Sequence, residues 1–212
     1  DHWRERLQRP ASFQPHVCDA GAYNPPGDSQ TTDGLRTIEA AIAARAEALA
    51  RFDRDLALVG SVAPKVILSD AASLPLTYAR RLGIPGYLLA NFTWADIYRP
   101  HAAKLGAEAR ELVRGLGSEY AQATAILRTE PALRMTRYRA PVIDVGMVGS
   151  PGRSRPSELR KLFDIPSKAT LVYSYLGRYG QSGMDWDRLA ELGRRGYHFI
   201  GFHPAPVGPL PN

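Results

Sequence analysis

The clearest pattern along the chain is a pair of short apolar runs with an amphipathic segment between them. Residues 66–69 and 86–90 are apolar runs of strand length, and residues 74–82 carry a proline near their start and a glycine just after their end. That placement of proline and glycine is typical of a helix, which Ser73 would cap. Two strands joined by a helix run parallel with a right-handed crossover, so the pattern predicts a β-α-β unit.

A longer apolar stripe precedes this unit. Apolar residues recur at spacings of three and four from residue 35 to residue 59, which predicts one long helix with Thr31, Thr32 or Asp33 as its cap. The other side of this helix carries charges of both signs, and we interpret it as solvated surface. These charged residues are Arg36, Glu39, Arg45, Glu47, Arg51, Asp53, Arg54 and Asp55.

The central unit is followed by a mixture of helical and strand patterns. Thr93 would cap a helix that begins at Trp94. The further expected elements are helices over 108–116 and 119–125 and strands over 126–128 and 142–148.

A second β-α-β unit is predicted near the end of the chain. The stretch GSPGRSRP at 149–156 has the composition of an interdomain linker. The elements expected after it are a helix over 156–163, a strand over 170–176, a helix over 185–195 and a strand over 197–202. The fold class is therefore α/β, with two Rossmann-like parallel-sheet domains at 1–149 and 150–212. Two strands and one helix cannot bury a core of their own, so we expect the second domain to be truncated.

Composition narrows the class of protein. Hydrophobic residues make up 44% of the chain, which supports a folded core, and no apolar run approaches the roughly 20 residues that span a bilayer. Cys18 is the only cysteine, which excludes an internal disulfide and favours the cytoplasm. We expect Cys18 to be buried as a small hydrophobic residue. The five histidines show no ligand spacing, so we expect no protein metal site.

The net charge of +6 is concentrated in one region. Residues 128–161 contain eight basic and three acidic residues. No aromatic interleaving or known binding module accompanies them, so we expect no nucleic-acid partner. A solvated basic face is one interpretation. The alternatives are attraction of a nucleotide diphosphate across an interdomain cleft and peripheral contact with an anionic membrane surface.

Three short motifs of the central unit point to a family. Ser69-Asp70 at a strand end, Gly83-Ile84 at a helix end and Asn91-Phe92-Thr93-Trp94 at the next turn occur in this order. In this the chain resembles GT-B-type glycosyltransferases, in particular the glycosyltransferase-like N-terminal domain of arabinokinase-type proteins. The resemblance implies that the first strand and loop of the first domain are missing and that the chain is truncated at both ends. It also places a histidine base upstream of residue 1.

Residues 177–183 form a G-x-x-G-x-x-G loop between a predicted strand and a predicted helix. Glycines there allow backbone N–H groups to approach an anion at a helix N-terminus, although a plain tight turn would use the same residues. The resemblance implies that this loop contacts the diphosphate of a nucleotide sugar. The implied donor-binding residues are Gly177, Arg178, Gly180, Gln181 and Ser182.

The other candidate site lies at the carboxyl end of the central strands, where open α/β sheets bind ligands. Asn91, Thr93 and Trp94 would bind an acceptor, because Trp stacks on sugar faces and Asn bonds hydroxyl groups. The alternative is that Thr93 only caps a helix and Trp94 fills the core. Asp70 and Asp96 are candidates for a general base that takes a proton from the acceptor.

The function implied by the resemblance is transfer of a sugar from a nucleotide-diphosphate sugar to an acceptor hydroxyl or amine. We expect a metal-independent transferase without a cofactor, whose partners are the nucleotide sugar and an acceptor. Two alternatives remain open. One is a sugar-nucleotide epimerase of the same fold, and the other is a non-catalytic sugar-sensing domain.

Overall fold

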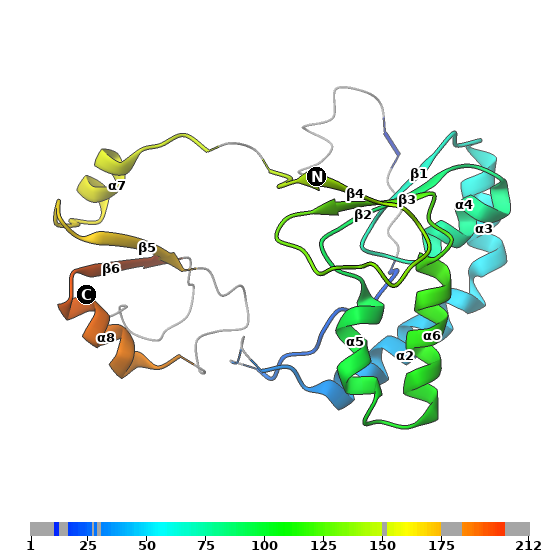
Figure 1. Cartoon of the computed structure of the whole chain (residues 1–212), viewed down its shortest axis with the longest axis horizontal. Helices are drawn as coiled ribbons and strands as arrows, with labels where there is room; N and C mark the ends of the chain where they lie inside the picture. The colour runs from blue at the N-terminus through cyan, green and yellow to red at the C-terminus, as the bar shows by residue number, and fades with distance from the viewer. Residues whose placement is uncertain are drawn as a thin grey trace. The chain divides into compact units, whose positions relative to one another are not determined.

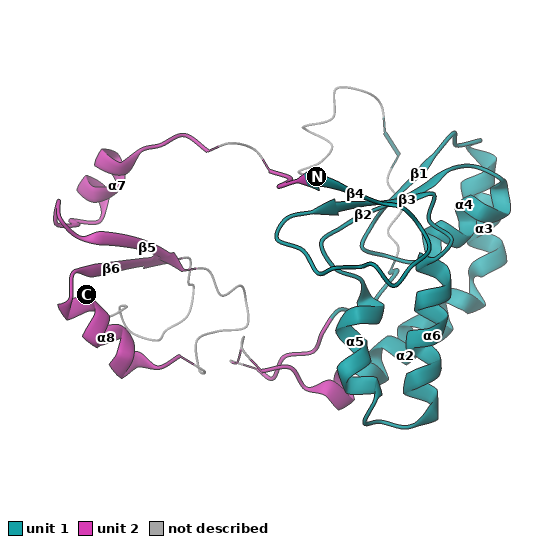
Figure 2. Cartoon of the chain, viewed as in Figure 1, with its two compact units in different colours: residues 1–21, 38–145 teal, residues 22–37, 146–212 magenta. Residues whose placement is uncertain are grey.

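The computed structural model describes residues 11–12, 17–26, 28, 31–149, 152–174 and 184–201. The chain forms two compact units (Figure 2). Unit 1 contains residues 1–21 and 38–145, and unit 2 contains residues 22–37 and 146–212. Within the described ranges, no helix is long and apolar enough to pass through a lipid bilayer.

The first sheet has four strands in the order β1-β2-β3-β4 (Figure 1). These strands are β1 Ile67–Asp70, β2 Gly86–Ala90, β3 Ala125–Thr129 and β4 Val142–Gly146. β1 runs parallel to β2, with Ile67 opposite Gly86, and β2 runs parallel to β3, with Tyr87 opposite Ala125. The predicted β-α-β unit is therefore confirmed, with its first strand shifted by one residue.

The helices of this region are α2 Gly34–Ala50, α3 Phe52–Ser61, α4 Leu74–Leu82, α5 Trp94–Ala102 and α6 Ala107–Tyr120. Their apolar sides bury one main core against the sheet, in which Leu76, Leu88, Tyr98, Tyr120 and Ile126 are almost fully enclosed. The expected long helix is wrong in one respect, because it is divided at Arg51. The two helices expected over 108–116 and 119–125 form the single helix α6, since Gly117 and Ser118 do not interrupt it.

The hydrogen bonds at the helix N-termini show which of the expected capping residues act as caps. Asp33 accepts a hydrogen bond from the Arg36 amide at 3.0 Å, and Thr93 accepts one from the Asp96 amide at 3.2 Å. Ser73 makes no capping bond, so that expectation is wrong. The backbone φ and ψ angles of Ser73 lie in the right-handed helical region. Its hydroxyl donates instead to Glu119 Oε2 at 2.6 Å.

Unit 2 contains a second parallel pair of strands. Its elements are α7 Pro156–Leu162, β5 Thr170–Ser174, α8 Trp186–Arg194 and β6 Tyr197–Gly201. β5 and β6 run parallel, with Thr170 opposite Tyr197, and Asp185 caps α8 by accepting from the Arg188 amide at 2.9 Å. The α/β class with parallel sheets is thus confirmed in both units.

Candidate functional site

The carboxyl ends of β1 and β2 form the edge where the sequence places an acceptor site. Asp70 ends β1 opposite Leu89, and Asn91 follows the last residue of β2. The two side chains therefore start from the same edge of a parallel sheet. α5 begins three residues after Asn91 and carries the remaining candidates.

Asp70 lies in an open groove of about 500 Å³ that Cys18 and Asp19 also line. Its side chain is exposed. Its carboxylate makes no hydrogen bond or ion pair to any residue that the structure describes. A carboxylate in this state can accept a proton from a bound hydroxyl group.

Asp96 is in a different situation, because its carboxylate is already engaged. Oδ2 accepts a hydrogen bond from the Thr93 hydroxyl at 2.8 Å and from the Tyr138 hydroxyl at 3.4 Å. Oδ1 lies 3.8 Å from Arg99 and 3.9 Å from Arg137. Together with the Thr93 cap, these contacts form a reciprocal capping arrangement at the start of α5. Of the two candidate bases, Asp70 has the accessible carboxylate.

Asn91 and Thr93 fix the shape of the edge. The Asn91 side-chain amide donates to the Pro131 carbonyl at 3.0 Å, and the backbone carbonyl of Asn91 accepts from the Leu133 amide at 2.8 Å. These two bonds tie the loop after β3 to the end of β2. Thr93 is 0% exposed, and its hydroxyl lies 2.7 Å from that of Tyr138. Thr93 therefore caps α5 from a buried position, as the alternative to acceptor binding predicts.

Trp94 is the centre of an aromatic cluster at the start of α5. Its ring stacks on Tyr98 with centroids 5.4 Å apart and forms a T-shaped pair with Phe92, with centroids 4.9 Å apart. Its backbone amide donates to the Tyr120 hydroxyl at 3.2 Å, and that hydroxyl donates to the Ala71 carbonyl at 2.6 Å. The indole Nε1 atom is buried and has no hydrogen-bond partner among the residues that the structure describes. An unpartnered buried donor is unfavourable, and a ligand or water that accepts from it removes the penalty.

Trp94 lines a cavity of about 30 Å³, which has room for one or two water molecules. The cavity lies among α2, α6, the start of α4 and the segment at residues 18–20. The residues with polar side chains that line it with Trp94 are Cys18, Asp19, Arg45, Ser73, Tyr98 and Glu119. Arg45 Nη2 lies 2.8 Å from Glu119 Oε1, and the Arg45 and Glu119 side chains are 22% and 8% exposed. The cavity therefore offers donors and acceptors in a largely apolar wall.

The interpretation of the charged side of α2 and α3 as solvated surface is wrong for two residues, Arg45 and Asp55. Arg45 was expected on a solvated side, yet it lies between the buried residues Ala41 and Ala48 on the core side of α2. Asp55 is also buried, at 7% exposed. The signal for Arg45 was its spacing of four and three residues from the two alanines, which share one helix face.

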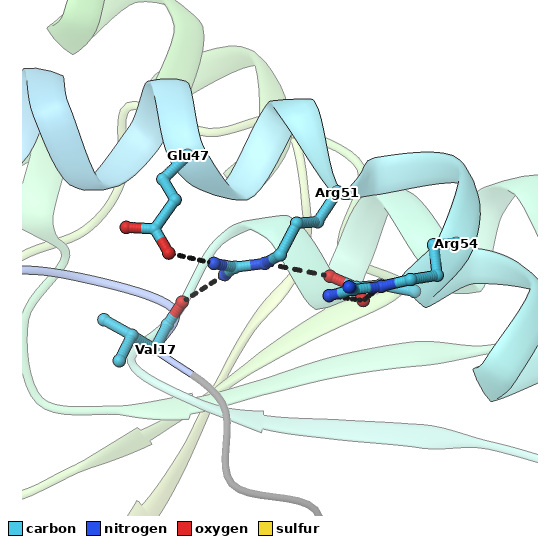
Figure 3. Close-up of polar contacts among 5 residues, drawn as sticks. Val17, Glu47, Arg51 and Arg54 are labelled. Carbon is cyan, nitrogen blue, oxygen red and sulfur yellow. Dashed lines mark hydrogen bonds and ion pairs between the residues drawn. The ribbon is translucent and has the colours of Figure 1, made fainter.

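Arg51 fixes the segment that lines both the cavity and the groove (Figure 3). Its guanidinium donates to the Val17 carbonyl at 3.2 Å and to Glu47, and it lies 3.6 Å from Asp55. This arrangement holds the residues that follow Val17 against α2 and α3. The expected solvated role is therefore wrong for Arg51 as well.

Cys18 lies in this segment and is exposed, so the expectation of a buried cysteine is wrong. Partial burial of its sulfur raises the pKa of the thiol, and the negative charge of Asp19 raises it further. Burial likewise raises the pKa of four core tyrosines, Tyr78, Tyr98, Tyr120 and Tyr138, and for Tyr78 the pKa reaches about 12. These groups stay protonated at neutral pH.

The predicted donor-binding residues Gly177, Arg178, Gly180, Gln181 and Ser182 lie outside the described residues. Their role stays a prediction from the sequence. Within the described ranges, no three or more His, Cys, Asp or Glu side chains are grouped so that they could hold a metal ion.

No protein-family model and no curated protein matches the chain. One solved structure with a similar arrangement is Phytolacca americana UGT2, complexed with UDP-2fluoro-glucose and pterostilbene. The TM-score is 0.44 and the sequence identity 19%, over 75% of this chain and 47% of that chain. The present chain thus spans about half the length of that protein.

Proposed function

We propose that this chain is part of a GT-B-type glycosyltransferase that moves a sugar from a nucleotide-diphosphate sugar to an acceptor hydroxyl or amine. The observation that carries the proposal is a pair of polar groups near one edge of a parallel sheet, the Asp70 carboxylate and the Trp94 indole N–H, neither of which has a partner among the described residues. The segment with Cys18 and Asp19 lines both the groove of Asp70 and the cavity of Trp94. Such an edge is where open α/β sheets bind ligands.

In the proposed reaction, the acceptor oxygen attacks the anomeric carbon of the sugar. The bond from that carbon to the diphosphate oxygen breaks, and the acceptor proton passes to a carboxylate. Asp70 is the better of the two candidate carboxylates, since Asp96 is held by Thr93 and two arginines. Trp94 and Asn91 would position the acceptor, and Thr93 would hold the turn that carries them.

The glycine-rich loop at 177–183 would bind the diphosphate of the donor through its backbone N–H groups. No metal ion or cofactor is needed in this scheme, because the loop and the arginine Arg178 supply the positive charge. The sequence motifs of the central unit favour a relation to arabinokinase-type proteins, and the single exposed cysteine favours a cytoplasmic location.

The test is a titration of the full-length protein with nucleoside diphosphates and their sugars, followed by an assay for release of the nucleoside diphosphate. A transferase releases it only when an acceptor is present. An epimerase converts the sugar without an acceptor, and a sensing domain binds it without turnover. Absence of binding at about 5 mM for every nucleotide sugar would rule out all three functions, because this corresponds to a binding free energy weaker than about 3 kcal/mol.

The donor half of the proposal has its own test. Gly180→Val places a branched side chain in a loop that is expected to bring its backbone close to phosphate. We expect loss of two charge-assisted hydrogen bonds, which weakens nucleotide affinity by at least about a hundredfold. Unchanged affinity in a folded variant would remove the loop from the donor site and leave the acceptor half of the proposal standing.

A further inference from the structure

A groove lined by arginines lies on one side of unit 1, between the end of α5, the outer side of α6 and the loop before β4. It has a volume of about 890 Å³, which is within the range of small-molecule sites. Five arginines line it, and no aspartate or glutamate does. These residues, Arg99, Arg110, Arg114, Arg137 and Arg139, define what we call the arginine groove.

The positive charge of the arginine groove is only partly balanced. Arg99 and Arg137 share one carboxylate, that of Asp96, at 3.8 and 3.9 Å, and Arg114 pairs with Glu111. Arg110 and Arg139 have no ion pair with any residue in the described ranges. Two other arginines of the basic region do pair with carboxylates: Arg128 binds both carboxylate oxygens of Asp144 at 2.6 and 3.0 Å, and Arg155 lies 3.1 Å from Glu158.

The guanidinium N–H groups of the arginine groove also remain available to bind a ligand. Arg110, Arg114, Arg137 and Arg139 are exposed. The Nε atom of Arg99 is buried and has no hydrogen-bond partner within the described ranges. A guanidinium group binds phosphate through two parallel N–H bonds, and several together suit a ligand with more than one phosphate group.

The shape of the groove selects among anionic partners. Its apolar floor is sunk below the arginines, since Ala102, Val113 and Tyr138 are between 2% and 8% exposed. A membrane surface is flat and requires apolar side chains that project outward. Binding of single-stranded nucleic acid relies on accessible aromatic rings, and the one aromatic ring of this groove is buried. A concave site favours a compact soluble ligand.

We propose that the arginine groove is a binding site for a small soluble molecule that carries two or more phosphate groups. Its test does not depend on the proposed sugar transfer, because the probe contains neither a nucleoside nor a sugar. Arg110 and Arg139 contribute most to affinity, since they have no carboxylate to release before they bind the ligand.

Calorimetric titration with inorganic tripolyphosphate tests the proposal. At low ionic strength we expect a dissociation constant on the order of 10 μM, which rises as salt screens the charges. The variant with Arg110→Ser and Arg139→Ser should bind at least about tenfold more weakly. The matched control carries Lys65→Ser and Arg80→Ser, which removes the same charge from exposed positions outside the groove and should change affinity by less than about twofold.

Three results would overturn the proposal. They are an equal loss of affinity in both double variants, no binding of tripolyphosphate at about 5 mM, and arginine-dependent binding to phosphatidylglycerol vesicles or single-stranded RNA without binding of tripolyphosphate. Melting curves establish that the variants are folded. If the double variant is unfolded, the single change Arg110→Ser on the surface of α6 is compared with Arg80→Ser on the surface of α4.

Discussion

Arg45 on α2 and Glu119 on α6 form an ion pair inside unit 1, with Nη2 of the arginine 2.8 Å from Oε1 of the glutamate. The second carboxylate oxygen accepts from Ser73 at 2.6 Å, so the pair links three helices around the cavity beside Trp94. A buried pair of this kind contributes little net stability, but removal of one partner costs about 3 to 5 kcal/mol. The geometry of this ion pair therefore limits which side chains fit at the neighbouring positions.

Gly115 provides the space that the Arg45 guanidinium occupies. A Cβ atom at this position would lie 2.7 Å from Arg45 Nη2, whereas a Cβ at Gly117 would lie 4.0 Å from its nearest neighbour, on Tyr138. Gly117→Ala should stabilise the protein by about 0.5 to 1 kcal/mol through helix propensity. Gly115→Ala should lose that gain and leave the protein at least about 1 kcal/mol less stable than Gly117→Ala. Urea unfolding measures the difference, and equal stabilisation by both changes would contradict the role given to Gly115.

Tyr78 and Tyr120 differ in what their hydroxyl groups do. The Tyr120 hydroxyl bonds the Ala71 carbonyl and the Trp94 amide. The buried Tyr78 hydroxyl has no hydrogen-bond partner in the part of the chain that the structure describes. Tyr120→Phe should therefore destabilise the protein by about 1 to 3 kcal/mol, and Tyr78→Phe should be neutral or slightly stabilising. Thermal unfolding of the two variants tests this. A larger loss for Tyr78→Phe would mean that its hydroxyl has a partner.

Alkaline pH should reveal the raised pKa of Tyr78. Burial, followed by the negative charge of Asp55, raises this pKa to about 12, whereas an unfolded tyrosine titrates near pH 10. The unfolded state releases the proton first, so the free energy of unfolding decreases as the pH rises from about 10 to 12. Tyr78→Phe should make this decrease smaller. The measurement is urea unfolding at several pH values, and identical slopes in wild type and variant would contradict the prediction.

Trp94→Phe tests the acceptor side while it keeps an aromatic ring beside Tyr98. Phenylalanine is smaller than tryptophan, and it also removes the indole N–H, which has no hydrogen-bond partner among the described residues. The smaller ring fills the aromatic cluster less well, so the melting temperature should fall while the variant stays folded. If the N–H donates to the acceptor, the KM for acceptor should rise about 2- to 10-fold, which corresponds to one hydrogen bond. A stable variant with an unchanged KM would assign Trp94 to packing alone.

Much of the fold could be predicted from the sequence because its signals are local. The apolar runs that form β1 and β2 flank a helix with Pro75 at its start and Gly83 at its end, and Gly83 adopts the expected left-handed conformation with a φ of 66°. The parallel direction then follows from the crossover. Thr93 was also identified correctly as a cap, since its partner Asp96 lies only three residues away.

The contacts of the candidate site could not be predicted, because they join residues far apart in the sequence. Ser73 has the residue type of a cap, but the buried carboxylate of Glu119, 46 residues away, competes for its hydroxyl. Arg51 was placed on a solvated surface, yet it holds the Val17 carbonyl 34 residues away. Helix periodicity gives the side on which a residue lies, but it does not give the partner that the fold brings to it.

Acceptor-dependent release of nucleoside diphosphate by the wild type and by Asp70→Asn is the most direct test of the proposed sugar transfer. Asparagine keeps the size of the side chain and cannot accept the proton, so the turnover rate should fall about 100- to 10,000-fold with little change in donor affinity. Asp53→Asn, at an exposed position on α3, is the matched control and should retain the wild-type rate. Release that occurs without an acceptor, or a rate that is equal in the wild type and Asp70→Asn, would contradict the proposal.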